Sequence, residues 1–268
     1  MLRVANCLLG EDLGDDTLII GTSGRYEFKN KGIDVFLESL NRLNRDKDLK
    51  KKVLAFVNVP GWVGDPREDL QKRLKSKNKF TEPLQCPFIT HWLHNMTHDQ
   101  VLDMLKYLGM GNRPEDKVKV IFVPCYQDGH DGILNKHYYD LILGEDLSVY
   151  PSYYEPWGYT PLESVAFRVP TITTDLAGFG LWVNSLKNQH GINDGVEVLH
   201  RSDYNYSEVA DGIKDTVALF STKTEAEIKE IRKRAGQVAE QALWKHFIQY
   251  YYEAYDIALR NAMKRQLK

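Results

Sequence analysis

Cysteine is scarce in this chain of 268 residues, and long apolar runs are lacking. The three cysteines, Cys7, Cys86 and Cys125, are odd in number, widely spaced and outside any C-x-x-C pattern. This distribution supports neither a disulfide framework nor a cysteine-based zinc site, and it fits a reducing compartment. No apolar stretch approaches the roughly 18 residues that a membrane-spanning helix needs, and the opening residues turn acidic before an export signal is complete. We therefore expect a cytoplasmic protein that does not enter a membrane.

An excess of charge of either sign is also lacking, since the formal net charge is −2. Without a basic surplus, nucleic acid is not an expected partner. The patterns G-x-S-x-G, G-x-x-x-x-G-K-[ST] and G-x-G-x-x-G do not occur. The sequence therefore gives no support to a hydrolase with a nucleophile elbow, a P-loop nucleotidase or a dinucleotide-dependent oxidoreductase.

Short apolar segments rich in β-branched residues alternate with amphipathic segments. The predicted strands are residues 17–24, 52–60, 118–124, 147–152 and 169–175, and the predicted helices are residues 31–43, 65–77, 99–108, 136–143 and 161–167. This alternation predicts an α/β fold, a Rossmann-like parallel sheet with helices on both faces, which binds ligands beyond the carboxyl ends of its strands. From residue 204 onward only helical patterns remain. We expect a sheet domain, residues 1–203, and a C-terminal helical extension, residues 204–268, that packs on it.

The stretch "YYEPWGYTPLE", residues 153–163, contains two glutamates in one loop that precedes a helix. Pro156 disfavours helix at Glu155, so we expect the Glu155 carboxylate on the loop, where it can accept sugar hydroxyls. Gly158 lets a ligand approach the backbone, and the amides of the helix start can bind a phosphate. For Glu163 a structural alternative remains, because the segment Thr160 to Glu163 matches a capping box with Thr160 at the N-cap.

Two cations, Arg25 and Lys31, occupy the loop after the first strand, beside Gly24. Cations at this position can neutralise a diphosphate leaving group. The alternative is a pair of solvated surface cations, and the helix-start anion site nearby favours phosphate binding.

The stretch "HWLHNMTH" presents His91, His94 and His98 without the acidic partner of an H-E-x-x-H site, so no metal is expected. The stretch "DGHDG", residues 128–132, is interpreted as a polar turn.

Three long segments, "GRYEFKNKGIDVFLESLNRLN", "VKVIFVP" and above all "YPSYYEPWGYTPLESVAFRVPTITTDLAGFG", resemble the C-terminal half of the animal and fungal type of glycogen synthase, glycosyltransferase family 3. The resemblance covers residues 18–180 and continues more weakly through the final helices. It implies the C-terminal domain of a GT-B fold, in which two Rossmann-like domains face a cleft. It also implies a retaining transfer of glucose from UDP-glucose to the non-reducing end of an α-1,4-glucan, with neither a metal nor a cofactor.

The resemblance also implies roles for individual residues. Glu155 would contact the donor glucose in the catalytic centre, while Arg25 and Lys31 would stabilise the departing diphosphate. The other matched positions would bind the nucleotide, with Glu163 on the ribose and Tyr138 stacked on the uracil. The residues expected to bind the nucleotide are Gly24, Tyr138, Gly158, Tyr159, Thr160 and Glu163.

Two departures from the family pattern limit these expectations. The family's first domain has no counterpart here, so we expect nucleotide binding but little transfer by this chain alone. The expected partners are the nucleotide-sugar, the glucan acceptor, the missing domain and, since the sequence does not fix the assembly, a further copy in a homo-oligomer. The arginine-rich helix that senses glucose 6-phosphate in regulated members retains only Arg232 and Arg234, so we expect no activation by that sugar phosphate.

Two alternatives stay open. The donor could be ADP-glucose or another nucleotide-sugar, because the sequence identifies the contacts to the base only loosely. The chain could instead be a non-catalytic module that docks a glucan or a partner through the aromatic residues of its last helix.

Overall fold

The computed structural model describes residues 1–266, so the last two residues of the expected helical extension lie outside the described part. Its centre is a six-stranded parallel sheet in the order β5-β2-β1-β6-β7-β8. The strands are β1 (Leu18–Ser23), β2 (Val53–Asn58), β5 (Val118–Val123), β6 (Leu147–Val149), β7 (Thr171–Thr174) and β8 (Val196–Leu199). The chain runs outward from β1 to β5 and then returns to place β6 on the other side of β1. The strand order therefore reverses between β1 and β6, which is where ligands bind in sheets of this kind.

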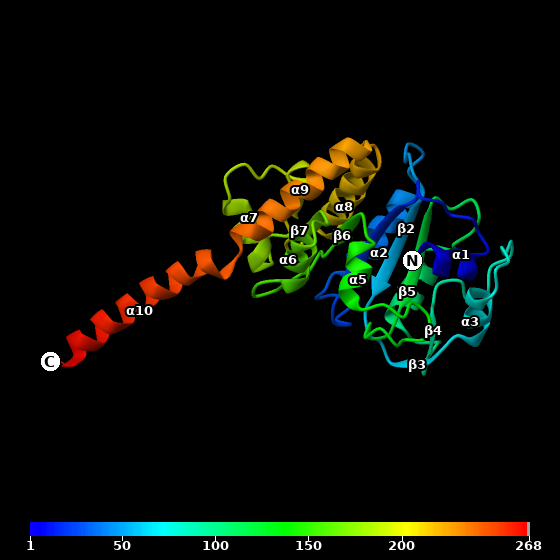
Figure 1. Cartoon of the computed structure of the whole chain (residues 1–268), viewed down its shortest axis with the longest axis horizontal. Coiled ribbons are helices and arrows are strands. Elements are labelled where there is room, and N and C mark those ends of the chain that lie inside the picture. Colours follow the sequence, from blue (N-terminus) through cyan, green and yellow to red (C-terminus); the bar gives the residue numbers. More distant parts are fainter. Residues whose placement is uncertain (267–268) are drawn as a thin grey trace.

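Helices cover both faces of this sheet (Figure 1). The helices are α1 (Leu2–Leu9), α2 (Ile33–Asn44), α3 (Glu68–Lys75), α4 (Gln100–Tyr107), α5 (Tyr138–Leu143), α6 (Tyr159–Ala166), α7 (Gly178–Ser185), α8 (Tyr206–Ser221), α9 (Glu225–Gln241) and α10 (Trp244–Gln266). A short antiparallel pair, β3 (Val63–Pro66) and β4 (His91–Leu93), lies outside the main sheet.

Alternate side chains of β2 show why helices must pack on both faces of the sheet. Val53, Ala55 and Val57 are fully buried in one apolar cluster with residues of α2, α4 and α8. Leu54 and Phe56 are fully buried in a second cluster with residues of α1 and α3. A strand that is apolar on both sides requires helices above and below it. The predicted fold class, a Rossmann-like parallel sheet covered on both faces, is therefore confirmed.

Several boundaries differ from the prediction. The strand predicted over residues 147–152 ends at Val149, before Pro151, which has no amide proton for a sheet ladder. The helix predicted over residues 161–167 begins earlier, at Tyr159. The elements α1, α7, β3, β4 and β8 were not predicted, because they are short and their apolar positions are too few to show a period.

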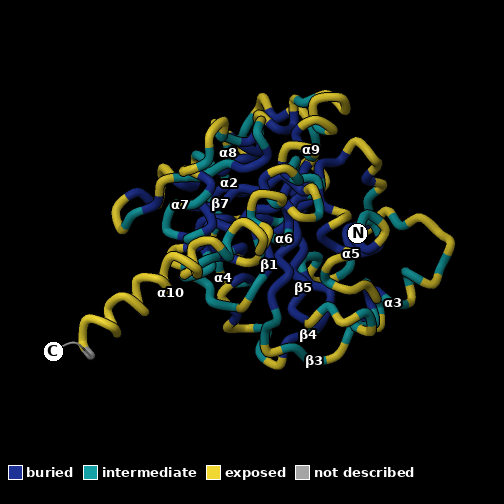
Figure 2. The backbone as a smooth tube through the Cα atoms, turned by 60° about the vertical axis from the view of Figure 1, so that its left-hand side comes forward, coloured by how far each residue is buried: buried dark blue, intermediate teal, exposed yellow. Residues whose placement is uncertain are grey.

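The three helices expected after residue 204 are confirmed as α8, α9 and α10. Helix α8 buries Val209, Ile213 and Phe220 in the same cluster as the sheet. Helix α10 projects away from the rest of the chain (Figure 1), and most of its length is exposed (Figure 2). Within residues 1–266, no helix is both long enough and apolar enough to cross a membrane.

Candidate functional site

The loop after β1 and the loop after β6 meet beyond the carboxyl ends of these strands. The carbonyl of Asn30 in the first loop accepts a hydrogen bond from the amide of Tyr153 in the second, at 2.7 Å. Gly32 has φ 67°, and a Cβ atom there would lie 2.0 Å from the carbonyl oxygen of Pro151. A side chain at this position would force the loops apart, so glycine is required for their contact.

An ion pair joins the same two loops. The Lys31 ammonium contacts Oε1 of Glu155, and the two side chains are only 14% and 15% exposed. The hydroxyl of Ser152 donates to the same carboxylate oxygen at 3.3 Å. Two of the residues with an expected catalytic role are thus in contact, and the charge of the cation compensates that of the partly buried carboxylate.

Arg25 lies on the same loop as Lys31 but points elsewhere. Its side chain is 76% exposed and forms an ion pair of 3.0 Å with Glu27. Exposed pairs of this kind contribute about 1 kcal/mol or less. The guanidinium can therefore leave Glu27 for an anion at little energetic cost.

The backbone around Glu155 is fastened to the segment between β7 and α7. The Glu155 amide donates to the carbonyl of Leu176 at 3.3 Å, and the Glu155 carbonyl accepts from the amide of Gly178 at 3.1 Å. A Cβ atom on Gly178 would lie 2.3 Å from the Pro156 carbonyl oxygen. These contacts hold the Glu155 segment extended at the sheet edge, as Pro156 predicted.

The capping-box interpretation of Glu163 is wrong. The N-cap of α6 is Gly158, with φ 104°, rather than Thr160, and no side chain of the described residues caps this end. Because the glycine starts the helix at Tyr159, Thr160 is already inside the first turn. Glu163 instead accepts a hydrogen bond of 3.1 Å from the hydroxyl of Tyr139. The first amides of α6 therefore remain available to an anion.

A cavity of about 360 Å³ lies at the ends of β1 and β2, beside the starts of α5 and α6. Gly24, Tyr138 and Thr160, three of the residues expected to bind the nucleotide, line it together. Tyr126, whose residue surface is 78% exposed, supplies a second aromatic ring. The cavity thus offers two aromatic side chains beside the helix-start anion site.

The sequence interpretation missed Tyr126 and Asn58, which also lines the cavity. Both residues could have been identified from their positions at the ends of strands. Asn58 is the single polar residue in the strand "VLAFVN", and Tyr126 follows the strand end at Val123. Polar and aromatic residues at strand ends become ligand candidates once the strand order is known.

A row of hydrogen-bonded side chains runs from this cavity into the sheet. Its members are Tyr138, Ser23, Tyr150, Ser164, Ser148 and Glu145, with successive distances of 2.9, 3.4, 2.8, 3.2 and 2.7 Å. Burial raises the pKa of the Glu145 carboxyl to about 8, and Glu145 is only 2% exposed. Burial also raises the pKa of the Tyr138 hydroxyl. At neutral pH the row is therefore a chain of protonated groups that fixes the Tyr138 ring.

His94 and His98, for which no metal site was expected, do not join His91 in a group of possible metal ligands among the described residues. Ligand atoms of His91, Cys125 and Asp131 instead lie within 4.8 Å of one another. The Asp131 carboxylate already accepts three backbone amide bonds of 2.7–2.9 Å, from residues 133–135. In the predicted polar turn, residues 128–132, the His130 amide donates to the Asp128 carboxylate at 2.9 Å. Burial raises the pKa of the Cys125 thiol to about 12, so the thiol is protonated at neutral pH in the protein without a metal. The three side chains are thus close together, and the Asp131 carboxylate has a structural role in the loop.

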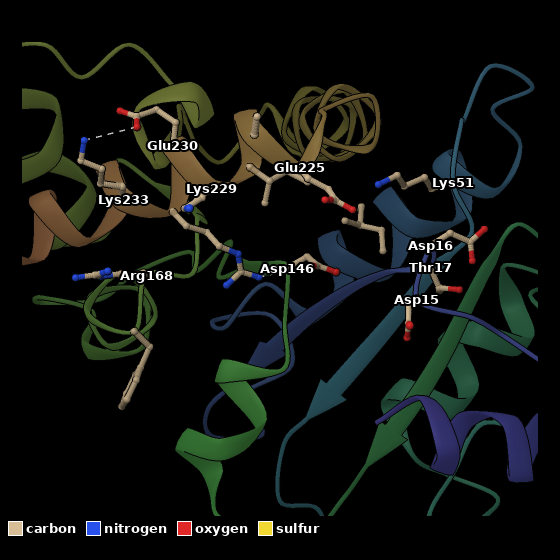
Figure 3. Close-up of a pocket in the computed structure, with 15 residues that line it drawn as sticks. Asp15, Asp16, Thr17, Lys51, Asp146, Arg168, Glu225, Lys229, Glu230 and Lys233 are labelled. Carbon is tan, nitrogen blue, oxygen red and sulfur yellow. Dashed lines mark hydrogen bonds and ion pairs between the residues drawn. The ribbon is translucent and has the colours of Figure 1, made fainter.

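A second hollow, of about 950 Å³, lies at the opposite edge of the sheet between α9 and residues 15–18 (Figure 3). Its lining mixes acidic and basic side chains. Arg232 donates to the Glu145 carbonyl at 2.7 Å and to Asp146 at 3.3 Å. Arg234, which does not line this hollow, pairs with Asp194 at 2.8 Å. Both arginines that the family pattern retains are therefore engaged within the chain.

A family model described as "Glycogen synthase" matches residues 9–67 and 65–268. The chain belongs to this family. Glycogen [starch] synthase of Neurospora crassa is 28% identical over 92% of this chain and 42% of that protein, and isoform 2 of Saccharomyces cerevisiae is 29% identical over 95% of this chain and 44% of that protein. The Caenorhabditis elegans protein is 32% identical over 70% of this chain and 35% of its own length. The chain thus spans less than half the length of these relatives.

Solved structures agree on the fold. The pneumococcal O-GlcNAc transferase GtfA, in complex with UDP and GlcNAc, has a TM-score of 0.50 at 13% identity, covering 90% of this chain and 36% of that one. The apo structure of OtsA has a TM-score of 0.53 at 12% identity, covering 90% of this chain and 44% of that one. These similarities support the expected glycosyltransferase fold of the GT-B class.

Proposed function

We propose that this chain is the donor-binding half of a glycogen synthase-like retaining glucosyltransferase. The enzyme would move glucose from UDP-glucose to the non-reducing end of an α-1,4-glucan. The observation that carries the proposal is the contact between Lys31 and Glu155 at the reversal of the strand order. Membership of the glycogen synthase family supports it.

In the proposed complex the donor lies with its base in the cavity and its glucose at Glu155. The base occupies the cavity between Tyr126 and Tyr138, and the ribose lies near Glu163 on the next turn of α6. The diphosphate meets the free amides at Tyr159 and Thr160. The glucose then reaches Glu155, whose carboxylate accepts its hydroxyls.

The chemical step needs positive charge near the leaving group. The bond between glucose C1 and the diphosphate oxygen breaks, and its electron pair leaves with UDP. The acceptor hydroxyl forms the new bond at C1, and its proton passes to the departing diphosphate oxygen. Lys31, and Arg25 once its guanidinium has left Glu27, supply positive charge to the departing diphosphate, and the loss of one such group typically lowers kcat about 10²- to 10³-fold. In this proposal the side chains and the start of α6 stabilise the leaving group without a metal.

The proposed enzyme also binds an acceptor glucan, and it contains a second domain that faces this one across the cleft. The fungal relatives are more than twice as long as the part that this chain matches. We expect the chain alone to bind UDP and to transfer little glucose.

Calorimetric titration with UDP tests the proposal. The wild-type chain should bind UDP, and Lys31→Met should weaken binding at least about tenfold, because a charge-assisted hydrogen bond contributes about 1.5–3 kcal/mol. Lys106→Met, on an exposed position of α4, is the matched control and should bind like the wild type. Absence of UDP binding by the wild type, or equal affinity of the Lys31 variant, would overturn the proposal. Titration with ADP in parallel decides between UDP-glucose and ADP-glucose as donor.

The docking alternative has one observation in its favour. Trp244, Tyr251 and Tyr255 lie on one face of α10, with ring centroids 5.0 and 6.3 Å apart along the series, and all three are about half exposed. Exposed aromatic rows on a helix can bind a partner. Glucan binding that survives Lys31→Met, in a chain without UDP affinity, would favour this function.

A further inference from the structure

A buried arginine lies beside the two loops that carry Lys31 and Glu155. Arg201 follows β8 by two residues, at the carboxyl edge of the sheet, and it is only 5% exposed. Its amide donates to the Asp175 carboxylate at 2.9 Å, which fixes its backbone to the end of β7. Arg201 belongs to none of the motifs that predicted the site, because β8 itself was not predicted.

The guanidinium of Arg201 contacts both loops. Its Nη1 atom donates to the carbonyl of Pro151, in the loop after β6. A Cβ atom added to Gly32, in the loop after β1, would lie 2.8 Å from the same nitrogen. The guanidinium carbon lies 5.5 Å from the centre of the Tyr153 ring, which is within the range of a cation–π contact. One side chain thus occupies the junction at which the two loops meet.

These contacts adjoin both members of the ion pair. Gly32 follows Lys31 directly. Ser152 follows Pro151, and its hydroxyl donates to Oε1 of Glu155 at 3.3 Å. A displacement of Pro151 would therefore move a group that holds the carboxylate, and a displacement of Gly32 would move the residue that carries the ammonium. The directions of both charged groups depend on a contact that neither of them makes.

The charge of Arg201 has no ion-pair partner within residues 1–266, unlike the charges of Arg42, Arg67 and Arg232. Burial lowers the pKa of the guanidinium, and the charge of nearby Asp34 counteracts this effect. A buried cation is costly unless it is paired or hydrogen-bonded. An apolar side chain of similar length would fill the same space without this cost, so packing alone does not account for an arginine here.

We propose that Arg201 is a positioning residue of the donor site. By holding the loops after β1 and β6 together, it aligns the Glu155 carboxylate with the donor glucose. A lysine could keep the charge at this position, but it lacks the planar fork that spans two contacts. This inference rests on the proposed function and deepens it.

Calorimetric titrations with UDP and UDP-glucose test this role, since the ratio of the two affinities measures the contact with the sugar. Arg201→Met removes the guanidinium, and the ratio should fall about threefold to tenfold, the typical contribution of one hydrogen bond. Arg201→Lys should show a smaller fall. Arg67→Met is the matched control, because Arg67 is also fully buried and donates to backbone carbonyls, those of residues 85, 86 and 89. The control should have a lower Tm and an unchanged ratio.

A double-mutant cycle with Glu155→Gln shows whether Arg201 acts through Glu155. In the Glu155→Gln background the contact with the sugar is already lost, so Arg201→Met should change the ratio no further. A residue with a merely structural role would have the same effect in both backgrounds. If Arg201→Met does not fold, Arg201→Lys is compared in the two backgrounds instead.

Two results would overturn the inference and leave the proposed function standing. One is a lower Tm of the Arg201 variants together with an unchanged ratio, and the other is an equal fall of the ratio with and without Glu155. A wild type that binds UDP but gains no affinity from the glucose has no sugar contact to align, which also removes the inference. A wild type that binds no UDP removes the proposed function as well.

Discussion

Lys31 and Glu155, which are 124 positions apart in the sequence, form an ion pair at the one place in the sheet where the strand order reverses. The pair exists because β1 and β6 are neighbours and their following loops are held together at Gly32 and Tyr153. In the protein without ligand the two charges satisfy each other. A bound sugar diphosphate would separate their roles, with the cation on the phosphate and the carboxylate on the sugar.

Substitution of Glu155 by Gln separates these roles in a binding experiment. The amide keeps the shape of the side chain but no longer holds Lys31 as an ion pair. UDP affinity should stay the same or rise a few-fold, because Lys31 is free for the phosphate, whereas the extra affinity for UDP-glucose over UDP should fall about tenfold. Parallel calorimetric titrations measure both. An unchanged ratio of the two affinities would show that Glu155 does not contact the sugar.

Substitution of Gly32 by Ala should destabilise the fold through two effects. The positive φ costs about 1–2 kcal/mol for a residue with a side chain, and the new Cβ would lie 2.0 Å from the Pro151 carbonyl oxygen. Gly109→Ala is a matched control, since its φ is 69° and no heavy atom of the described chain lies within 4 Å of the added Cβ. Because the control shares the cost of the positive φ, urea unfolding should show Gly32→Ala to be less stable than the control by about 1–3 kcal/mol, the usual cost of overpacking. Equal losses would mean that the two loops are not tightly packed.

The buried carboxyl of Glu145 predicts a pH dependence of stability. Its pKa is about 8 in the folded protein and about 4.3 in an unfolded chain. The folded state therefore holds an extra proton between these values. The stability that this group contributes is fully present below the lower value and is lost as pH rises toward the upper one, by up to about 1.4 kcal/mol per pH unit.

Glu145→Gln does not titrate and should lack this loss. The free energy of unfolding of the variant, relative to the wild type, should rise steadily from pH 5 to pH 8 in urea titrations. Glu240→Gln, on an exposed position of α9, is the control and should follow the wild type. Parallel pH profiles for Glu145→Gln and the wild type would contradict the prediction.

Glucose 6-phosphate should not bind at the hollow beside α9. Arg232 is already paired with Asp146 in the hollow, and Arg234 pairs with Asp194 outside it. The five basic side chains that line the hollow are matched by five acidic ones. A dianionic sugar phosphate would have to separate Arg232 from Asp146 and approach the carboxylates. Calorimetric titration at millimolar glucose 6-phosphate should give no saturable heat in a sample that binds UDP. A saturable signal that Arg232→Ala abolishes would show that the site is retained.

The sequence predicted the sheet because strands such as β2 and β5 are apolar on both faces, a pattern that only a covered parallel sheet explains. It also predicted which loops carry the site, since Arg25, Lys31 and Glu155 each follow a strand. It could not predict which groups touch. The contact between Lys31 and Glu155 depends on β1 and β6 being neighbours, a property of strand order rather than of local pattern.

The role of Glu163 shows the limit of local motifs. The segment from Thr160 to Glu163 satisfies the capping pattern, but the backbone of Gly158 starts the helix earlier and places the motif inside it. Asn58 was overlooked for a related reason. A single polar residue at a strand end forms no repeating sequence pattern that could reveal it. Its lack of a hydrogen-bond partner is visible only in the structure, where its neighbours from β1 and β5 are known.

The row of hydroxyl groups between Glu145 and Tyr138 has a polarity, because each hydroxyl has a single proton to give. Ser148 donates to Glu145, and the orientation of every following hydroxyl is constrained by the one before it. An ionised Glu145 accepts only, whereas its neutral form also has a proton to give. Loss of one proton deep in the sheet therefore leaves the row a single direction, toward Glu145, whereas the neutral carboxyl permits either, and the phenol at the cavity wall is the far terminus of the row.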